Sequence, residues 1–377
     1  MKKYFFISLI CASLVGLALM IFLTDYGEQN VIEQKAEPKK IVAIFIDQST
    51  YNSISTEIQQ YKNDIESDLN VEVQLYTGNF QNPSEIRNKM IAIKHRLAGS
   101  VLIGNIPIFY FEFDEPYAGM PTLKKFPSDR YYMDLDGIFP DENNNGIPDW
   151  TKYEYISKAP EKLYWSGRIK SYDSPNNIKL LSAYFDRNHK YRIGDIEIDK
   201  SLFVYSMDIQ SGPSGDTYEI YENNMKDSFY YSNLYLKDQV SLIVDTSKSK
   251  FLEELDKDYE SASINAHGNW HDQQIGNGIT VHDIKTVKPK PYFYYLLSCS
   301  NGDFSKKDYL AAHYLFDGNG LMVLSYTMPA LLGADESNFY MEFLSQGDTF
   351  GEAFVHVQKR VNELQATMIG DPTLSVR

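Results

Sequence analysis

The sequence predicts an α/β protein of two stacked α/β subdomains with mostly parallel sheets, preceded by an N-terminal membrane-spanning segment. Short, apolar, β-branched runs alternate with longer runs of helical period, first over residues 40–106 and again after residue 175. An aromatic, acidic and turn-rich stretch separates the two sets. The 377 residues, 43% of them hydrophobic, suffice for two domains of ordinary size or for one large α/β unit.

Residues 1–26 have the pattern of an uncleaved signal anchor. Lys2 and Lys3 precede twenty uncharged residues that end at Leu23, a length that spans a bilayer as a helix. Basic residues before this run and acidic residues after it predict that the rest of the chain lies outside the cytoplasm, in the periplasm or at the cell surface. The alternative is a cleaved signal peptide and a secreted protein. Residues 27–39 then form a polar linker.

The N-terminal subdomain, residues 40–170, begins with a regular alternation of elements. Its first strand is apolar throughout, which is typical of a parallel strand buried on both faces. The expected order is strand 40–46, helix 55–69, strand 71–77, helix 84–97 and strand 99–106.

The C-terminal subdomain, residues 171–377, repeats this alternation after a helix at 175–192. We expect strands at 201–207, 240–246, 261–268, 292–299 and 320–327, and helices at 248–259, 306–316, 335–346 and 349–365.

The charge of the chain limits its partners. The formal net charge is −15, and no tract rich in lysine and arginine is present. Binding to nucleic acid needs clustered positive charge, so the sequence argues against a nucleic-acid partner.

Two residues at successive strand ends can carry chemistry. Cys299 ends the strand "YFYYLLSC", and because Cys11 falls in the anchor, no disulfide can form within the exported part. His267 ends the strand "SASINAH". Carboxyl ends of parallel strands gather at one edge of a sheet, so imidazole and thiol can meet there. The alternatives are a buried, inert cysteine and a structural histidine.

The chemistry of this pair is that of a cysteine peptidase. His267 can take the proton of the Cys299 thiol and later protonate the leaving amine. The backbone N–H groups of Gly268 and Cys299 can stabilise the developing oxyanion. No cofactor is needed for this catalysis.

The blocks around these residues resemble those of gingipain-type cysteine peptidases, within the caspase-like group. The resemblance is carried by "AHG" and "SCSNGDF", and by "GNIPIFYFE", "PSDRYYMDLDG", "WSGRIKSYDS", "SGPSGD" and "IGDPTLSVR" in the same order. It implies a caspase-like fold whose second subdomain is catalytic, with Cys299 as nucleophile and His267 as base.

The sequence departs from the family pattern at the residue that orients the histidine. The resemblance implies an acidic residue before the "GPS" turn that helps to orient the catalytic histidine. At the matching position this chain has Gln210. Asp208, two residues earlier, would share a strand face with it and is the substitute. The resemblance to arginine-specific members implies an acidic residue in the S1 pocket shortly after that turn. In this chain the candidates closest to that position in the sequence are Glu219 and Glu222.

A separate pattern predicts a structural calcium ion. The loop "DENNNGIPD" supplies oxygen ligands at EF-hand positions one, three, five, seven and nine. Position twelve is a lysine, Lys152, so another carboxylate, from Glu154, Asp134 or Asp136, has to complete the shell. The alternative is a polar turn without an ion. The predicted ligands are Asp141, Asn143, Asn145, the Ile147 carbonyl and Asp149.

Together these features predict a membrane-anchored, extracytoplasmic cysteine endopeptidase with a polypeptide substrate. A transpeptidase of sortase type would use the same two residues, with an amine in place of water. A protein that is not an enzyme is the other alternative: a catalytically degenerate, calcium-binding envelope protein. This alternative arises because the residue at the histidine-orienting position, Gln210, is neutral.

Overall fold

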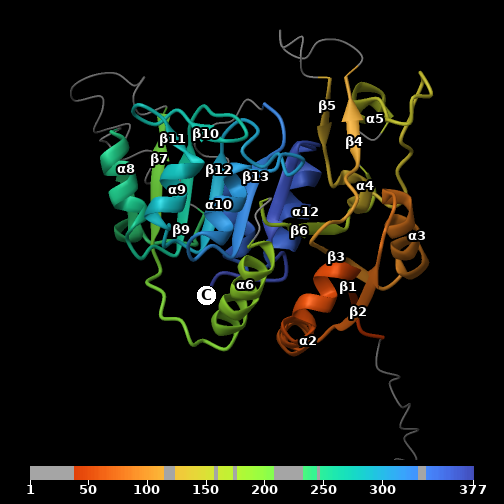
Figure 1. The fold of residues 1–377 in the computed structure, drawn as a ribbon, viewed down its shortest axis with the longest axis horizontal. Coiled ribbons are helices and arrows are strands. Elements are labelled where there is room, and N and C mark those ends of the chain that lie inside the picture. Colours follow the sequence, from red (N-terminus) through yellow and green to blue (C-terminus); the bar gives the residue numbers. More distant parts are fainter. Residues whose placement is uncertain are drawn as a thin grey trace, which may run out of the picture. The chain divides into compact units, whose positions relative to one another are not determined.

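A ten-stranded β-sheet forms the centre of residues Lys39–Arg377 (Figure 1). The computed structural model describes residues 38–113, 124–156, 160–172, 176–207, 232–243, 247–329 and 337–377. The strand order is β2-β1-β3-β6-β14-β13-β12-β9-β7-β8. Every neighbouring pair is parallel except β13 and β14. The predicted α/β class with a mostly parallel sheet is confirmed.

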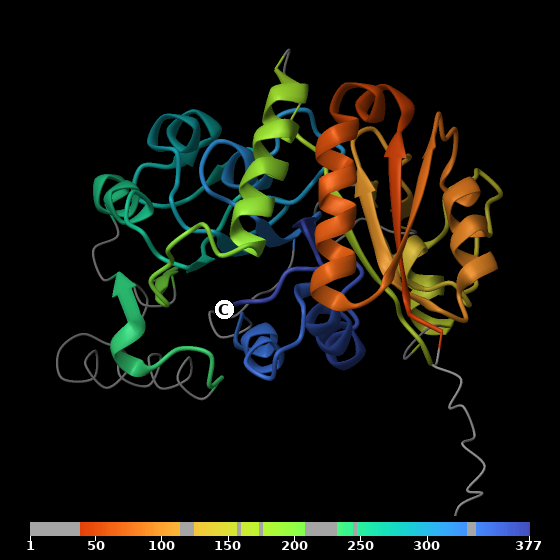
Figure 2. The ribbon, with the colours of Figure 1, turned by 90° about the horizontal axis from the view of Figure 1, so that it is seen from below.

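The N-terminal half contributes one end of this sheet. Helix α2 begins at Gln48, seven residues before its predicted start, because the Asp47 carboxylate accepts the Thr50 N–H at 3.0 Å and caps it. Helices α2 and α3 lie on opposite faces of the strands (Figure 2). The elements are β1 Ile41–Asp47, α2 Gln48–Leu69, β2 Glu72–Gly78, α3 Pro83–Ile93, β3 Leu97–Ile103, β4 Tyr110–Glu112, β5 Lys125–Pro127, α4 Arg130–Met133, α5 Trp150–Ile156 and β6 Trp165–Ile169.

The C-terminal half contributes the other end, with helices on both faces. Alternate side chains of β12 show this: Tyr294 contacts Tyr314 of α10, whereas Tyr295 contacts Tyr340 of α11 on the opposite face. The elements are α6 Asn177–Arg192, β7 Leu202–Ser206, η2 Lys237–Gln239, β8 Val240–Ile243, α8 Lys248–Leu255, β9 Ser261–Asn265, β10 Asp272–Gln273, β11 Ile279–Thr280, α9 Val281–Val287, β12 Phe293–Leu297, α10 Leu310–Phe316, β13 Met322–Tyr326, α11 Ser337–Leu344, α12 Phe350–Val361 and β14 Ala366–Gly370.

The two halves share one sheet, which corrects the prediction of two stacked subdomains. Strand β6 of the N-terminal half pairs with β14, the last strand of the chain, through Arg168 and Ile369. Helix α6 lies beside α2 in both views (Figures 1 and 2), and Arg192 of α6 donates to Asp68 of α2 at 2.6 Å. The halves are therefore side by side, joined by strand pairing and by helix contacts.

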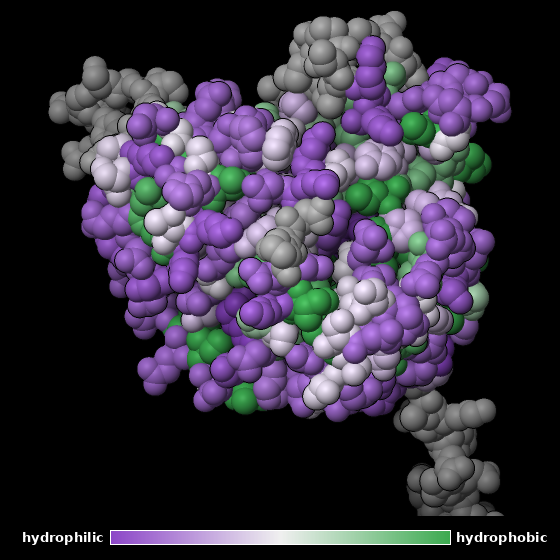
Figure 3. All heavy atoms as spheres, viewed as in Figure 1, coloured by the Kyte–Doolittle hydropathy of each residue, from purple (hydrophilic) through white to green (hydrophobic). Residues whose placement is uncertain are grey.

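One face of the molecule is mostly polar. Hydrophilic side chains dominate the face shown in Figure 3, and apolar side chains are scattered over it.

None of the helices within the described residues is both long and apolar enough to cross a membrane. The predicted anchor, residues 1–26, lies outside the described residues and stays a prediction.

Candidate active site

His267 and Cys299 follow neighbouring strands at the same level. In the parallel pairing of β9 with β12, the last register pair is Asn265 with Leu297. His267 and Cys299 each come two residues after that pair. Both strands are fully buried, whereas the His267 side chain is exposed and Cys299 is partly exposed. The chain thus emerges from the core at the two residues whose side chains the chemistry requires.

A tight turn after Cys299 fixes the direction of the chain. Ser300 has a left-handed backbone, with φ of 58°, which costs a residue with a side chain about 1 kcal/mol. Its N–H donates to the Met328 carbonyl at 3.3 Å, and the Gly302 N–H donates to the Tyr326 carbonyl at 2.8 Å. These bonds to the end of β13 hold the turn in place.

Asn301 joins this turn to the loop that carries His267. It is fully buried, and its Nδ2 donates to the carbonyl oxygens of Asn269 and Asp272, the latter at 3.2 Å. Its Oδ1 is buried and has no hydrogen-bond partner among the described residues. The approach is so close that a Cβ on Gly268 would lie 2.6 Å from the Asp272 carbonyl oxygen and 3.2 Å from Asn301 Nδ2. Glycine at 268 is thus a packing requirement of this contact.

The N–H of Gly268 is not used in the short bridge that its loop forms. Gly268 is bridged to Gln273, but the bonds there run from the Gln274 N–H to the His267 carbonyl, at 2.7 Å, and from the Asn269 N–H to the Asp272 carbonyl, at 3.0 Å. The Gly268 N–H can therefore donate a hydrogen bond to a ligand.

Buried hydrogen bonds of Gln273 connect the His267 loop to the end of β12 and to α10. Gln273 is fully buried; its Nε2 donates to Ser298 Oγ at 3.2 Å, and its Oε1 accepts the Tyr314 hydroxyl at 2.9 Å. Sequence reasoning missed Gln273 and the role of Asn301, because a lone amide residue gives no signal until its partners are known.

The turn continues into residues that dock on the N-terminal half. The Arg168 guanidinium lies 4.5 Å from the centre of the Phe304 ring and forms two hydrogen bonds with Asp129, at 2.6 and 3.2 Å. Asp303 is nearly buried, and this burial raises the pKa of its carboxyl. Arg168 and Asp129 belong to the blocks "WSGRIKSYDS" and "PSDRYYMDLDG", so these blocks position the Cys299 turn.

The other predicted residues of the peptidase site follow strand β7 in the sequence. Asp208, Gln210, Glu219 and Glu222 lie outside the described residues. Strand β7, which precedes them, ends at Ser206, and Ser206 pairs with Asn265 of β9.

The predicted calcium loop is folded around its own oxygens. Asp141 accepts the N–H groups of Asn145 and Gly146, at 3.1 and 2.8 Å, and Asn145 Oδ1 accepts the Ile147 N–H at 2.8 Å. Asp149 is buried and accepts the Glu142 N–H at 2.7 Å.

The carboxylate that contacts this loop from outside it belongs to Glu112, which the sequence analysis did not predict. Glu112 of β4 accepts the side-chain amides of Asn143 and Asn145. The three carboxylates expected to complete the shell are engaged elsewhere or turned outward: Asp134 accepts the Tyr153 hydroxyl at 2.7 Å, Asp136 pairs with Lys94, and Glu154 is exposed. Lys152 pairs with Glu142 at 3.3 Å. Among the described residues, no group of three or more His, Cys, Asp or Glu side chains is close enough to hold a metal.

Comparison with solved structures identifies the same fold in a protease. The crystal structure of the Arg-specific cysteine proteinase gingipain R (RgpB) superposes with a TM-score of 0.58 and 15% sequence identity, covering 91% of this chain and 79% of that chain. The complex of the Porphyromonas gingivalis RgpB pro- and mature domains gives a TM-score of 0.58 and 14% identity, covering 90% of this chain and 80% of that chain. No family model and no curated protein matches the sequence. At these identities the likeness shows the fold alone: this chain has a fold similar to that of gingipain R.

Proposed function

We propose that this protein is a membrane-anchored, extracytoplasmic cysteine endopeptidase of gingipain type. The observation that carries the proposal is the register of β9 and β12, in which His267 and Cys299 each follow the Asn265–Leu297 pair by two residues. In a parallel sheet, reactive groups at that position share one edge.

The proposed reaction proceeds through a thioester. His267 takes the proton of the Cys299 thiol, and the sulfur attacks the carbonyl carbon of the scissile peptide. The C–N bond then breaks as His267 returns the proton to the leaving amine. Water, deprotonated by His267, attacks the thioester, releases the new carboxyl terminus and restores the thiol.

The oxyanion of the tetrahedral intermediate is stabilised by the backbone. The N–H groups of Gly268 and Cys299 are the proposed donors. Each donor is expected to stabilise the transition state by about 3 kcal/mol. Asn301 supports this arrangement, because its bonds to the His267 loop fix Gly268 relative to the Cys299 turn.

Three further parts of the proposal come from the sequence. Asp208 or Gln210 orients His267, and Glu219 or Glu222 binds a basic P1 side chain. A signal anchor over residues 1–26 holds the enzyme at the membrane with its catalytic part outside the cytoplasm.

A structural calcium ion belongs to the proposal as well. Asp141 and Asp149 supply carboxylates, and Asn143, Asn145 and the Ile147 carbonyl supply neutral oxygens, which are the hard donors that Ca²⁺ prefers. Glu112 accepts the side-chain amides of Asn143 and Asn145 and positions them. The ion would stabilise the loop beside strand β4, and no proposed catalytic step uses it.

The experiment that tests the enzyme is labelling with peptide acyloxymethyl ketones that carry Arg, Lys or Asp at P1. Full-length protein in detergent should be labelled at Cys299, fastest by a basic probe, and Cys299→Ala and His267→Ala should lose labelling. His282→Ala is the matched control, because His282 is an exposed histidine on α9. If Cys299 reacts no faster than a free thiol, or if His267→Ala leaves the rate unchanged, the protein is not this enzyme.

A further inference from the structure

A buried histidine of α10 lies between two carboxylates. His313 Nδ1 is 2.6 Å from Asp317 Oδ2, and His313 Nε2 is 2.8 Å from Asp308 Oδ1. The Tyr172 ring stacks on the imidazole, with 4.1 Å between the two ring centres. His313 is 2% exposed, whereas the Asp308 side chain is 53% exposed. Each nitrogen of a buried imidazole thus faces a carboxylate oxygen.

This geometry suits the charged form of the imidazole. A neutral imidazole carries one N–H group, so its other nitrogen would point a lone pair at a carboxylate, whereas the imidazolium donates from both nitrogens. Hydrogen bonds between a charged donor and a carboxylate are also stronger than those between neutral groups. Loss of the proton would leave the carboxylates of Asp308 and Asp317 without the cation between them.

Histidine is the side-chain type that ordinarily changes its charge between about pH 5 and pH 8. Burial and the carboxylate of Asp317 raise the pKa of the Tyr172 hydroxyl, so this group keeps its proton and donates to Asp317 Oδ1 at 2.7 Å. Two helices bring further cations near the cluster. They are Lys285 of α9, 5.6 Å from the centre of the Tyr172 ring, and Arg187 of α6, which donates to the Leu315 carbonyl at 2.9 Å.

The start of α10 is bonded to both loops of the proposed active site. The Leu310 N–H donates to the carbonyl of Trp270, on the His267 loop, at 2.8 Å. The Ala311 N–H donates to the carbonyl of Asn301, on the Cys299 turn, at 3.0 Å. These are the first two residues of the helix, and His313 follows them within the same turn. A side chain that fixes α10 therefore fixes the two loops relative to each other.

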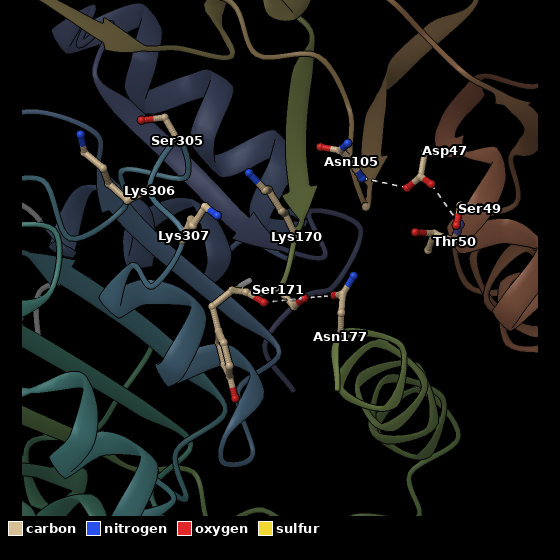
Figure 4. A pocket seen from close by; sticks show the side chains of 12 residues that line it. Asp47, Ser49, Thr50, Asn105, Lys170, Ser171, Asn177, Ser305, Lys306 and Lys307 are labelled. Carbon is tan, nitrogen blue, oxygen red and sulfur yellow. Dashed lines mark hydrogen bonds between the residues drawn. The ribbon is translucent and has the colours of Figure 1, made fainter. Parts of the chain in front are cut away.

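The cluster also ties α10 to the segments on either side of it. Asp308 lies on the segment that leads from the Cys299 turn into the helix, and Asp317 follows the last helical residue. Residues 305–307 of that segment line one pocket with Lys170, two residues before Tyr172 (Figure 4). The imidazole thus connects the segment before α10, the end of α10 and, through Tyr172, the chain that follows β6.

We propose that His313 is a positioning residue of the proposed active site: its imidazolium, held between Asp308 and Asp317, fixes α10 and so holds the His267 loop and the Cys299 turn together. When the imidazole loses its charge, a bare nitrogen faces a carboxylate and the first turn of α10 is held less firmly. The contribution of His313 to the peptidase rate therefore decreases as the pH rises. Its effect on the rate rests on the proposed function, whereas its effect on α10 does not.

The first measurement is the rate at which a basic peptide acyloxymethyl ketone labels Cys299 in full-length protein in detergent, over a pH series. Dividing the wild-type rate by the rate of His313→Gln at each pH cancels the ionisation of the other groups. This ratio should be about tenfold near pH 5.5, where the variant lacks the charged donor, and should fall toward one near pH 9. His356→Gln is the matched control, because His356 is an exposed histidine that faces one carboxylate, Asp348, at 3.6 Å. A ratio that does not change with pH would overturn the inference.

Asp308→Asn is the second variant, and it should fold because the Asp308 side chain is largely exposed. An amide can accept from a ring N–H or donate to a bare ring nitrogen, so this variant suits both forms of the imidazole. Its labelling rate should equal that of the wild type near pH 5.5 and exceed it several-fold near pH 9. The same pH dependence in Asp308→Asn as in the wild type would count against the charged histidine.

Amide hydrogen exchange separates this inference from the proposed function. At pH 6, the peptide that contains Leu310 and Ala311 should exchange about tenfold faster in His313→Gln than in the wild type, because the start of α10 opens more often. Faster exchange in a protein that the probes do not label would overturn the peptidase and leave His313 as the residue that holds the two loops. Equal exchange in the two proteins would overturn the inference even where Cys299 is labelled.

Discussion

Asn301, on the turn that follows Cys299, donates through its side-chain amide to the main-chain carbonyl of Asp272, on the loop that carries His267. The distance is 3.2 Å, and the asparagine is fully buried. Two loops from different strands are thereby held together by one side chain. In the proposed peptidase this makes Asn301 a positioning residue, which acts through the placement of His267 and Gly268.

Asn301→Asp should therefore slow labelling of Cys299 by about tenfold to a hundredfold at neutral pH, because a carboxylate repels both carbonyl oxygens and cannot donate to them. The ratio of variant to wild-type rate should recover as the pH falls, since a protonated carboxyl donates again. Labelling rates over a pH series give this result, with Asn319→Asp, at a partly exposed turn, as control. A ratio that does not depend on pH would mean a purely structural role.

Arg168→Ala should destabilise the protein by about 3–5 kcal/mol, because it leaves Asp129 buried without its cation. Arg168→Lys keeps the charge but loses the two-bond geometry, so an intermediate loss is expected. Denaturant unfolding measures both. Lys190→Ala, which removes an exposed pair with Asp186, should leave the midpoint unchanged. Equal midpoints for Arg168→Ala and wild type would contradict a structural role for the buried pair.

Stability should fall as the pH rises through the range in which Glu260 loses its proton. Burial raises the pKa of this carboxyl from 4.5 to about 7, and its Oε2 has no partner among the described residues. The folded protein thus keeps a proton that the unfolded chain has lost above pH 4.5. The stability that this group contributes is complete below pH 4.5 and decreases toward pH 7, by at most about 3 kcal/mol.

Glu260→Gln imitates the protonated side chain and should remove this dependence. The variant should equal the wild type near pH 5 and exceed it near pH 8 in free energy of unfolding, measured with urea. Glu253→Gln, an exposed residue that pairs with Lys250, is the control and should keep the wild-type dependence. The same slope in Glu260→Gln as in the wild type would show that another group is responsible.

Chelation should lower the unfolding midpoint if the loop 141–149 holds calcium, by about 2–4 °C for each kcal/mol of binding free energy. Glu112→Gln removes the carboxylate that reaches Asn143 and Asn145, so its midpoint should respond less to EDTA. Glu142→Gln changes an exposed carboxylate of the same loop and should respond as the wild type does. An EDTA-insensitive wild type would remove calcium from the proposal.

Asp208→Asn should reduce kcat/KM for a basic peptide substrate by about a hundredfold and alter its pH profile, whereas Gln210→Ala should have a small effect. The reason is the position in the sequence: Ser206, the last residue of β7, pairs with Asn265, the last residue of β9, and Asp208 and His267 each come two residues later in the sequence. A carboxylate at 208 can hold the imidazole in the productive orientation. A larger loss in Gln210→Ala than in Asp208→Asn would reverse this assignment.

The sequence predicted most strands of the sheet but missed the two that join its halves. Residues 165–169 contain a glycine and an arginine, and residues 366–370 are short and mixed, so neither has an apolar strand pattern. Both are fully buried as β6 and β14. The arginine is tolerated because Asp129, 39 residues away, neutralises it, and this partnership cannot be seen in a local pattern.

The sequence by itself determined the α/β class, the alternation of elements and the positions of Cys299 and His267 after strands, because these depend on local hydrophobic period and on residue type. Only the tertiary structure decided that both halves form one sheet, that Asn301 joins the two loops, that Glu112 faces the loop 141–149, and that Tyr172 stacks on His313. Such relations depend on strand order and register, which bring together residues that are far apart along the chain.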